Sequence, residues 1–196
     1  QNKDYKKAIE SYRKAVAADE DNLNLQKGLA QALLDNDQDQ EAETEYKKIL
    51  AADPDEGVAY LRLGQIYRKR GNSGQALEYF NKASTILVGS FEVSYNIGLL
   101  HEEMGQYEKA DEQFQRLLKL TEKSNSSFSA VESQTRRIFL YHAGLIAQQL
   151  EKYSQAVDYF SQIKRMSPDE SVKVDLYIID TYRQAKEMGK ALTASA

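Results

Sequence analysis

The sequence predicts an all-α protein built from repeated helix–turn–helix units. The same residue types recur at a fixed step of 34 residues along most of the chain. Within each stretch the apolar residues follow the i, i+3, i+4, i+7 spacing of an amphipathic helix. Only two of the 196 residues are proline, which favours long helices. A fixed period of this length indicates stacked units that bury their apolar faces against their neighbours.

Residues 57–90 show the unit most clearly. The first half carries the motif Y-x2-L-G-x2-Y, and the second half carries A-x3-F-x2-A. Each half predicts an amphipathic helix. Gly71, Asn72 and Gly74 fall between the two halves and predict a tight turn there.

Three kinds of position define the period. A small residue would let the two helices of a unit approach closely, and the aromatic residue four positions later would fill the space beside it. The first helix contributes a large aliphatic residue. These positions are Ala8, Ala42, Ala76 and Ala110; Tyr12, Tyr46, Phe80 and Phe114; and Leu29, Leu63 and Ile97.

The pattern resembles the tetratricopeptide repeat (TPR) family, whose units follow one another every 34 residues. Pro54 and Pro168 stand where that family places a proline after the second helix. The resemblance implies a right-handed α-solenoid of about five to six units, with both ends truncated.

We expect a single array over residues 1–196. Its parts are a partial repeat at 1–22, repeats at 23–56, 57–90 and 91–124, an insertion at 125–136, a repeat at 137–170 and a partial repeat at 171–196.

The insertion is inferred from a break in the period. Ala156 lies 46 residues after Ala110, which is one period plus 12. The polar run 124–127 is typical of a loop and can cap a helix. Residues 130–149 then predict one long helix that opens the next repeat.

Composition excludes several classes of protein. The net charge is −4, so no basic excess predicts nucleic-acid binding. No apolar run approaches the roughly 18–20 residues of a membrane span. The absence of cysteine excludes disulfides, thiolate zinc sites and cysteine nucleophiles. The sequence predicts a soluble protein, cytoplasmic or periplasmic, and does not decide between the compartments.

The search for catalytic chemistry yields no candidate, and we expect no cofactor and no metal. His101 falls at a repeat position and is predicted to be a packed core residue. The acidic turn 35–39 lacks the glycine and the terminal glutamate of a calcium loop. No nucleotide-binding P-loop and no nucleophile turn is present in the sequence.

A binding surface is the remaining candidate site. In the TPR family, six positions of each first helix line a concave surface, on the side of the helix opposite its core residues. In this sequence, several of the matching positions hold apolar or aromatic residues, although the surface is expected to face solvent. Burial under the insertion or a neighbouring helix is the alternative. The candidate residues are Arg62, Gln65, Arg68, Lys69, Tyr95, Asn96, Leu99, Tyr141, His142 and Leu145.

Charge on this face has two interpretations. Arg62, Arg68 and Lys69 could hold an acidic peptide. Glu102 and Glu103 lie one period after Arg68 and Lys69, so these charges could instead pair between helices, which contributes only about 0–1 kcal/mol when exposed.

The sequence therefore predicts a non-catalytic scaffold that binds a partner peptide or helix in its concave face. Two alternatives stay open: a regulatory or substrate-recruiting arm of a larger enzyme, and a self-assembly module whose repeat ends form a homo-oligomer. Chaperone-tail binding is not predicted. Lys27 fits the carboxylate clamp that the family resemblance implies, but the other positions carry Gln31, Arg62, Glu92 and Asn96.

Overall fold

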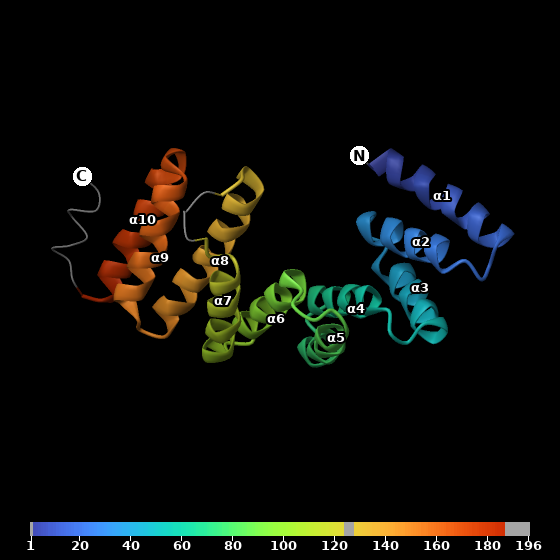
Figure 1. The fold of residues 1–196 in the computed structure, drawn as a ribbon, viewed down its shortest axis with the longest axis horizontal. Helices are drawn as coiled ribbons and strands as arrows, with labels where there is room; N and C mark the ends of the chain where they lie inside the picture. The colour runs from blue at the N-terminus through green and yellow to red at the C-terminus, as the bar shows by residue number, and fades with distance from the viewer. Residues whose placement is uncertain (1, 124–127, 187–196) are drawn as a thin grey trace. The chain divides into compact units, whose positions relative to one another are not determined.

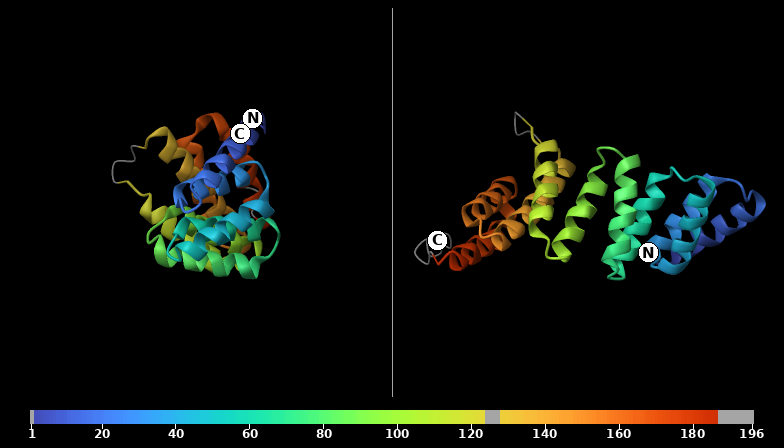
Figure 2. Two further views of the ribbon diagram at one scale, coloured as in Figure 1. Left: turned by 90° about the vertical axis from the view of Figure 1, so that its right-hand side faces the viewer. Right: turned by 90° about the horizontal axis from the view of Figure 1, so that it is seen from below.

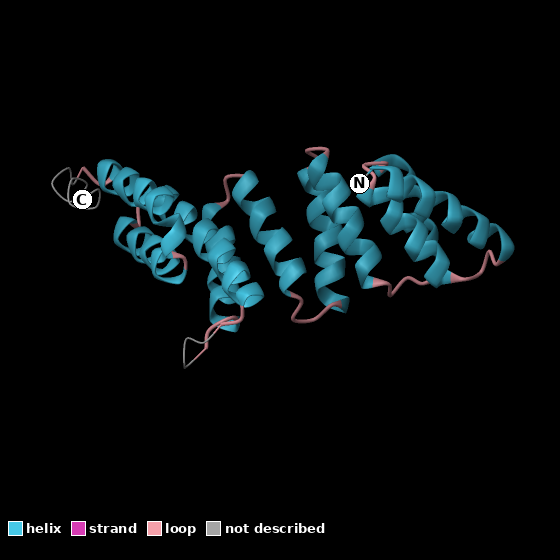
Figure 3. Cartoon of the chain, turned by 90° about the horizontal axis from the view of Figure 1, so that it is seen from above, coloured by secondary structure: helices cyan, strands magenta, loops and turns pink. Residues whose placement is uncertain are grey.

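The computed structural model describes residues 2–123 and 128–186, and within those ranges it contains helices and no strand (Figures 1 and 3). The all-α prediction is confirmed. The described helices are α1 Asn2–Ala18, α2 Leu23–Asp35, α3 Asp39–Ala52, α4 Gly57–Lys69, α5 Ser73–Ile86, α6 Phe91–Glu103, α7 Tyr107–Leu120, α8 Ala130–Gln149, α9 Tyr153–Met166, the short 3-10 helix η1 Pro168–Glu170 and α10 Ser171–Gln184.

The chain divides into two compact units, residues 1–93 and residues 94–196. Each unit has its own hydrophobic cluster of buried side chains. The first is built around residues such as Leu33 and Leu63, and the second around residues such as Leu140 and Phe160. That both units belong to one continuous array stays a prediction.

The turn between α4 and α5 has the local geometry that its residues favour. Gly71 has φ +74°, a left-handed conformation that glycine adopts without strain. The Asn72 side chain then accepts a hydrogen bond from the Gln75 backbone N–H at 3.3 Å and caps α5. Gly74 lies inside the first turn of α5, two residues later than the connection itself.

Helix α8 is the long helix expected after the insertion, and it spans Ala130–Gln149. Ser129 caps it: the Ser129 side chain accepts from the Glu132 backbone, and the Glu132 carboxylate accepts from the Ser129 backbone at 2.9 Å. The expected cap within residues 124–127 lies outside the described residues. Helices α8, α9 and α10 (gold to red in Figure 2) pack against one another in sequence.

In three repeats a glycine of the first helix lies directly against an aromatic ring of the second. A Cβ atom built on Gly64 would lie 2.4 Å from the Phe80 ring, and one built on Gly144 would lie 2.5 Å from the Phe160 ring. Gly98 and Phe114 form the third pair, at 2.9 Å. Real Cβ atoms do not approach so closely, so these rings occupy the space that a methyl group would need. The sequence analysis assigned the close approach to Ala76 and its equivalents. Ala42, Ala76 and Ala110 are buried, and the glycines of the first helix are a further part of this contact.

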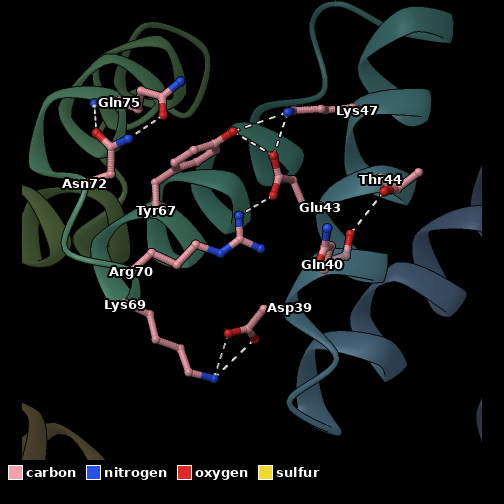
Figure 4. Close-up of polar contacts among 10 residues, drawn as sticks. All are labelled: Asp39, Gln40, Glu43, Thr44, Lys47, Tyr67, Lys69, Arg70, Asn72 and Gln75. Carbon is pink, nitrogen blue, oxygen red and sulfur yellow. Dashed lines mark hydrogen bonds and ion pairs between the residues drawn. The ribbon is translucent and has the colours of Figure 1, made fainter.

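Polar side chains fasten α3 to the repeat that follows it (Figure 4). The Glu43 carboxylate accepts hydrogen bonds from Lys47 Nζ at 2.6 Å, from the Tyr67 hydroxyl at 2.6 Å and from the Arg70 guanidinium. The Tyr67 ring also stacks on Tyr79, with centroids 5.2 Å apart. Partial burial alone would raise the pKa of Glu43, but the bonds from Lys47, Tyr67 and Arg70 outweigh it and lower that pKa to about 2.

The equivalent positions two repeats later, 68 residues along the chain, also make contacts to the following repeat, but with different residue types. Asp111, at the position of Glu43, accepts a bond from Lys152 Nζ at 2.7 Å. Gln115, at the position of Lys47, bonds the Tyr159 hydroxyl at 2.5 Å. This edge of the second helix therefore serves repeat-to-repeat packing in both units.

No helix in the part of the chain that the structure describes combines the length and the apolar character needed to cross a membrane.

Gly64→Ala should lower the free energy of unfolding by about 1–3 kcal/mol, because the new methyl group must displace the buried Phe80 ring. Denaturant unfolding followed by circular dichroism measures the change. Gly74→Ala is the matched control: a Cβ there meets no atom within 4 Å. It should leave stability unchanged or raise it by about 0.5–1 kcal/mol. Equal effects of the two substitutions would contradict the account.

Glu43→Gln should destabilise the protein by about 1–3 kcal/mol at neutral pH. The substitution removes a partly buried negative charge that accepts hydrogen bonds from Lys47, Tyr67 and Arg70. The folded-state pKa is lowered from 4.5 to about 2, so the stabilisation is present above about pH 4.5. It is lost as the pH falls from there towards 2. Native and variant proteins should therefore converge in stability over that interval.

The control for this prediction is Glu78→Gln. Glu78 pairs with Lys82 on the surface of one helix, and its side chain is 64% exposed. Its loss should change stability by less than about 0.5 kcal/mol. A Glu43→Gln penalty that persists unchanged at pH 2 would show that ionisation is not its source.

Candidate functional site

The predicted site residues of unit 1 are joined to neighbouring side chains. Arg62 donates from Nε to Gln31 Oε1 at 3.1 Å, and from Nη1 to Gln65 Oε1 at 3.1 Å and Glu92 Oε1 at 2.5 Å. Gln65 also donates to Glu92, at 3.3 Å. A ligand that binds Arg62 or Gln65 would therefore compete with these hydrogen bonds.

Lys69 pairs with the acidic turn of the preceding repeat. Its Nζ lies 2.8 Å from Asp37 Oδ1 and 2.9 Å from Asp39 Oδ2. The sequence analysis considered Glu102 and Glu103 as partners for Arg68 and Lys69. In the structure, Lys69 pairs with Asp37 and Asp39 instead. Lys69 reaches back because Asp37, with φ +56°, and Asp39 flank the turn that leads into α3.

A continuous series of aromatic rings runs through unit 2. The Phe114 ring stacks on His142 at 5.2 Å, and His142 meets Tyr141 edge-on at 5.4 Å. Tyr141 meets Tyr177 edge-on at 5.2 Å, and Tyr177 stacks on Phe160 at 5.4 Å. The series begins and ends on rings that lie against Gly98 and Gly144. The ring series therefore connects α7, α8, α10 and α9 through side-chain contacts.

Hydrogen bonds fix the middle of this ring series. His142 Nδ1 lies 2.8 Å from Glu102 Oε2, and Nε2 lies 3.4 Å from the Tyr95 hydroxyl. A hydrogen bond with Tyr177, together with partial burial, raises the pKa of Tyr141 to about 12. Tyr141 is therefore neutral at physiological pH. Both ring nitrogens of His142 are therefore engaged by side chains of unit 2.

A cavity of about 430 Å³ opens beside these rings, between α8 and α10. Three tyrosines, a histidine and aliphatic side chains form most of its wall. Arg137 and Lys173 carry the formal charges among its described lining residues, and neither aspartate nor glutamate is among them. The lining is Tyr95, Gln134, Arg137, Ile138, Tyr141, His142, Ile163, Lys173, Val174 and Tyr177.

The structure brings three of the ten predicted site residues to this cavity: Tyr95, Tyr141 and His142. Leu99 and Leu145 pack, half-buried, against the core of unit 2. Asn96 is only 4% exposed.

His101, the predicted core histidine, is 7% exposed, and its Nδ1 lies 3.0 Å from Gln106 Oε1. Burial lowers the pKa of His101.

Sequence reasoning missed Tyr177, Arg137 and Lys173. Tyr177 occupies the repeat position of Leu63 and Ile97, so the period alone predicts a core residue there. The equivalent residue one repeat earlier is Ala143, so the side chain at this repeat position changes from small to large between the two repeats. That change of volume is the signal in the sequence that could have indicated a cavity wall.

Comparisons with known proteins agree on the family. Models of the tetratricopeptide repeat match residues 1–66, 58–86, 91–124 and 139–170. Anaphase-promoting complex subunit 3 of Schizosaccharomyces pombe is 25% identical over 157 residues, which are 80% of this chain and 22% of that protein. Superkiller protein 3 of the same yeast is 31% identical over 99 residues, which are 50% of this chain and 7% of that protein. The chain thus spans a minor part of both relatives.

A shorter relative and two solved structures extend the comparison. Photosystem I assembly protein Ycf3 of Cuscuta obtusiflora is 24% identical over 137 residues, 65% of this chain and 79% of that protein. The crystal structure of YrrB, described as a TPR protein with an unusual peptide-binding site, superposes with a TM-score of 0.76 at 19% identity and covers 95% of this chain and 90% of that one. The Cut9–Hcn1 structure gives 0.71 at 19% identity, covering 98% of this chain and 36% of that one. The repeats, the helices and these matches together show that the chain belongs to the tetratricopeptide repeat family.

Proposed function

We propose that this chain is a non-catalytic interaction module that binds a segment of a partner protein in the unit 2 cavity. The cavity is the observation that carries the proposal. Its volume falls within the about 300–1,000 Å³ typical of ligand sites, and its wall combines apolar and aromatic surface with a few polar groups. Aromatic side chains on a rigid helical scaffold contribute much of the free energy of protein recognition.

The named relatives support the same class of function. One relative is a subunit of a complex, another is an assembly protein, and the YrrB structure is described by its peptide-binding site. The broader concave face predicted from the sequence, including Arg62 and Lys69, remains a second surface in this proposal. Its charged groups are already bonded within unit 1, so a ligand there would have to displace them.

Exposed apolar side chains on α8 and α10, one of them in the cavity lining, favour a protein partner. Ile138 lines the cavity and is 40% exposed. On α10, Val172 is 76% exposed and Leu176 is 62% exposed. A partner segment that seats one side chain in the cavity would cover Ile138. Burial of apolar surface contributes roughly 25 cal/mol for each Å² removed from water, before the costs of association are subtracted.

Site-specific photocrosslinking tests the proposal. The photoreactive residue p-benzoylphenylalanine replaces Ile138 in the full chain, and the protein is irradiated in a lysate of its source cells. A defined crosslinked protein is expected, because a bound segment would lie within reach of this side chain.

The matched control places the same photoreactive residue at Val131. Val131 lies on the same helix and is 74% exposed, but it does not line the cavity. The crosslinked protein should be absent or weak there. Identical products at both positions, or no product at Ile138, would contradict binding in the cavity.

A further inference from the structure

We infer that a second cavity, in unit 1, receives a tyrosine side chain of a partner protein. The cavity has a volume of about 370 Å³ and opens between α1, α2 and α3. That volume lies within the range of about 300–1,000 Å³ typical of ligand sites. The cavity shares no described lining residue with the unit 2 cavity, so the inference goes beyond the proposed function and does not depend on it.

Part of the wall of this cavity is apolar. Val16 and Ala17 come from α1, and Leu29 comes from α2, where it belongs to the buried core of unit 1. A ligand group with an apolar body would cover these side chains and remove their surface from water.

The charged part of the wall is balanced. Among the described lining residues, Arg13 and Lys48 carry positive charge, and Glu20 and Glu45 carry negative charge. Arg13 pairs with Glu41, and Lys48 Nζ lies 2.8 Å from Glu45 Oε1. A neutral group that can form hydrogen bonds meets no net repulsion from such a wall, and a phenol is a group of this kind at neutral pH.

The following repeat of unit 1 carries tyrosines at the equivalent positions. Gln26 and Glu45 line the cavity, and 34 residues after them stand Tyr60 and Tyr79. The centroids of these two rings lie 6.3 Å apart. The chain therefore shows that tyrosine rings suit the space between α3, α4 and α5, and it carries no ring at the corresponding two positions one repeat earlier.

A cation accompanies the tyrosine rings of that repeat. Lys82 Nζ lies 5.7 Å from the centroid of the Tyr60 ring, within the range of a cation–π interaction. Lys48 lines the cavity at the position equivalent to Lys82. A ring bound in the cavity would meet the Lys48 ammonium in the same way.

Second helices elsewhere in the chain donate hydrogen bonds to tyrosine hydroxyls of the next repeat. Lys47 Nζ on α3 bonds the Tyr67 hydroxyl at 3.2 Å. Gln115 Nε2 on α7 bonds the Tyr159 hydroxyl at 2.5 Å. Lys47 and Gln115 occupy the same repeat position, so a donor at this position is suited to hold a phenol.

Arg13 occupies that donor position on α1. The next repeat supplies no tyrosine at either receiving position, because the residues there are Leu33 and Glu45. The Arg13 guanidinium pairs with Glu41 through Nη2, and its other N–H groups can donate to the hydroxyl of a ligand. A tyrosine of a partner protein would supply the phenol that the chain itself supplies in later repeats.

A lysine or arginine side chain is the alternative ligand. Glu20 lines the cavity, and Asp19 and Asp21 flank it in the chain, so carboxylates adjoin one edge of the wall. The cations Arg13 and Lys48 oppose a further positive charge, and titration with model compounds separates the two ligands.

The test is an NMR titration of the native full chain labelled with ¹⁵N. Three probes represent single residues of a protein: N-acetyl-tyrosinamide, N-acetyl-phenylalaninamide and N-acetyl-lysinamide. Free tyrosine, the fourth probe, represents the amino acid. N-acetyl-tyrosinamide should shift the backbone signals of Val16, Ala17 and Leu29, with a Kd on the order of 1 mM. It should bind roughly tenfold more tightly than the phenylalanine compound because of its hydroxyl group, and more tightly than the lysine compound or free tyrosine.

Arg13→Leu removes the donor and keeps an apolar side chain in its place. It should weaken binding of N-acetyl-tyrosinamide roughly tenfold and abolish the preference over the phenylalanine compound. Lys14→Leu is the matched control. Lys14 is the next residue of α1, is exposed, pairs with Glu10 and lies outside the cavity lining. The control should bind every probe as the native protein does.

A second variant fills the cavity from within. Gln26→Tyr combined with Glu45→Tyr reproduces the residues of the following repeat and should abolish binding of N-acetyl-tyrosinamide. Its control is Gln40→Tyr combined with Thr44→Tyr. That control adds two tyrosines at exposed positions of α3 outside the cavity lining, and it should leave binding intact.

Several results would overturn the inference. These are tighter binding of the lysine compound, equal binding of the tyrosine and phenylalanine compounds, unshifted signals, or undiminished binding by folded Arg13→Leu or by the folded variant with the filled cavity. Tighter binding of free tyrosine would refute a partner protein as the source of the phenol. None of these results bears on the unit 2 cavity, which the crosslinking experiment tests separately.

Discussion

Each repeat depends on the close approach of its two helices, and in three repeats a glycine makes that approach possible. Glycine inside a helix costs about 0.5–1 kcal/mol relative to alanine, so its use at Gly64, Gly98 and Gly144 needs a compensating contact. The buried ring sixteen residues later provides it. In the repeat 23–56, Ala30 and Tyr46 occupy these positions and both are buried, so a methyl group is accommodated there.

In unit 2 this packing contact extends to the candidate binding site. Phe160, which lies against Gly144, stacks on Tyr177, and Tyr177 forms part of the cavity wall. At the other end of the ring series, Phe114 lies against Gly98 and stacks on His142. The residues that hold the repeats together therefore also fix the orientation of the rings that would meet a ligand. A site built in this way is preorganised, which reduces the entropy lost on binding.

The sequence could predict most of the fold, because local periodicity encodes it. The 34-residue step located the helices and the turn at Gly71, and the break after Ala110 predicted the long helix α8. The site was predictable only in part. Repeat positions indicated Tyr141 and His142 as site residues. The period assigns the same positions to the surface in every repeat, so it cannot distinguish one repeat from another. It could not show that Lys69 turns back to Asp37, since partner choice depends on side-chain reach across repeats.

The most direct test is whether the glycine contact controls the cavity wall. Tyrosine rings labelled with ¹³C give NMR signals that Tyr141→Phe and Tyr177→Phe assign. Gly144→Ala, which must displace Phe160, should shift the ring signals of both tyrosines in a protein that remains folded. Gly64→Ala, which displaces a ring of the other unit, should leave these two signals in place. Unchanged Tyr177 and Tyr141 signals in folded Gly144→Ala would contradict the account, because the cavity wall would then be independent of the contact that holds the repeat.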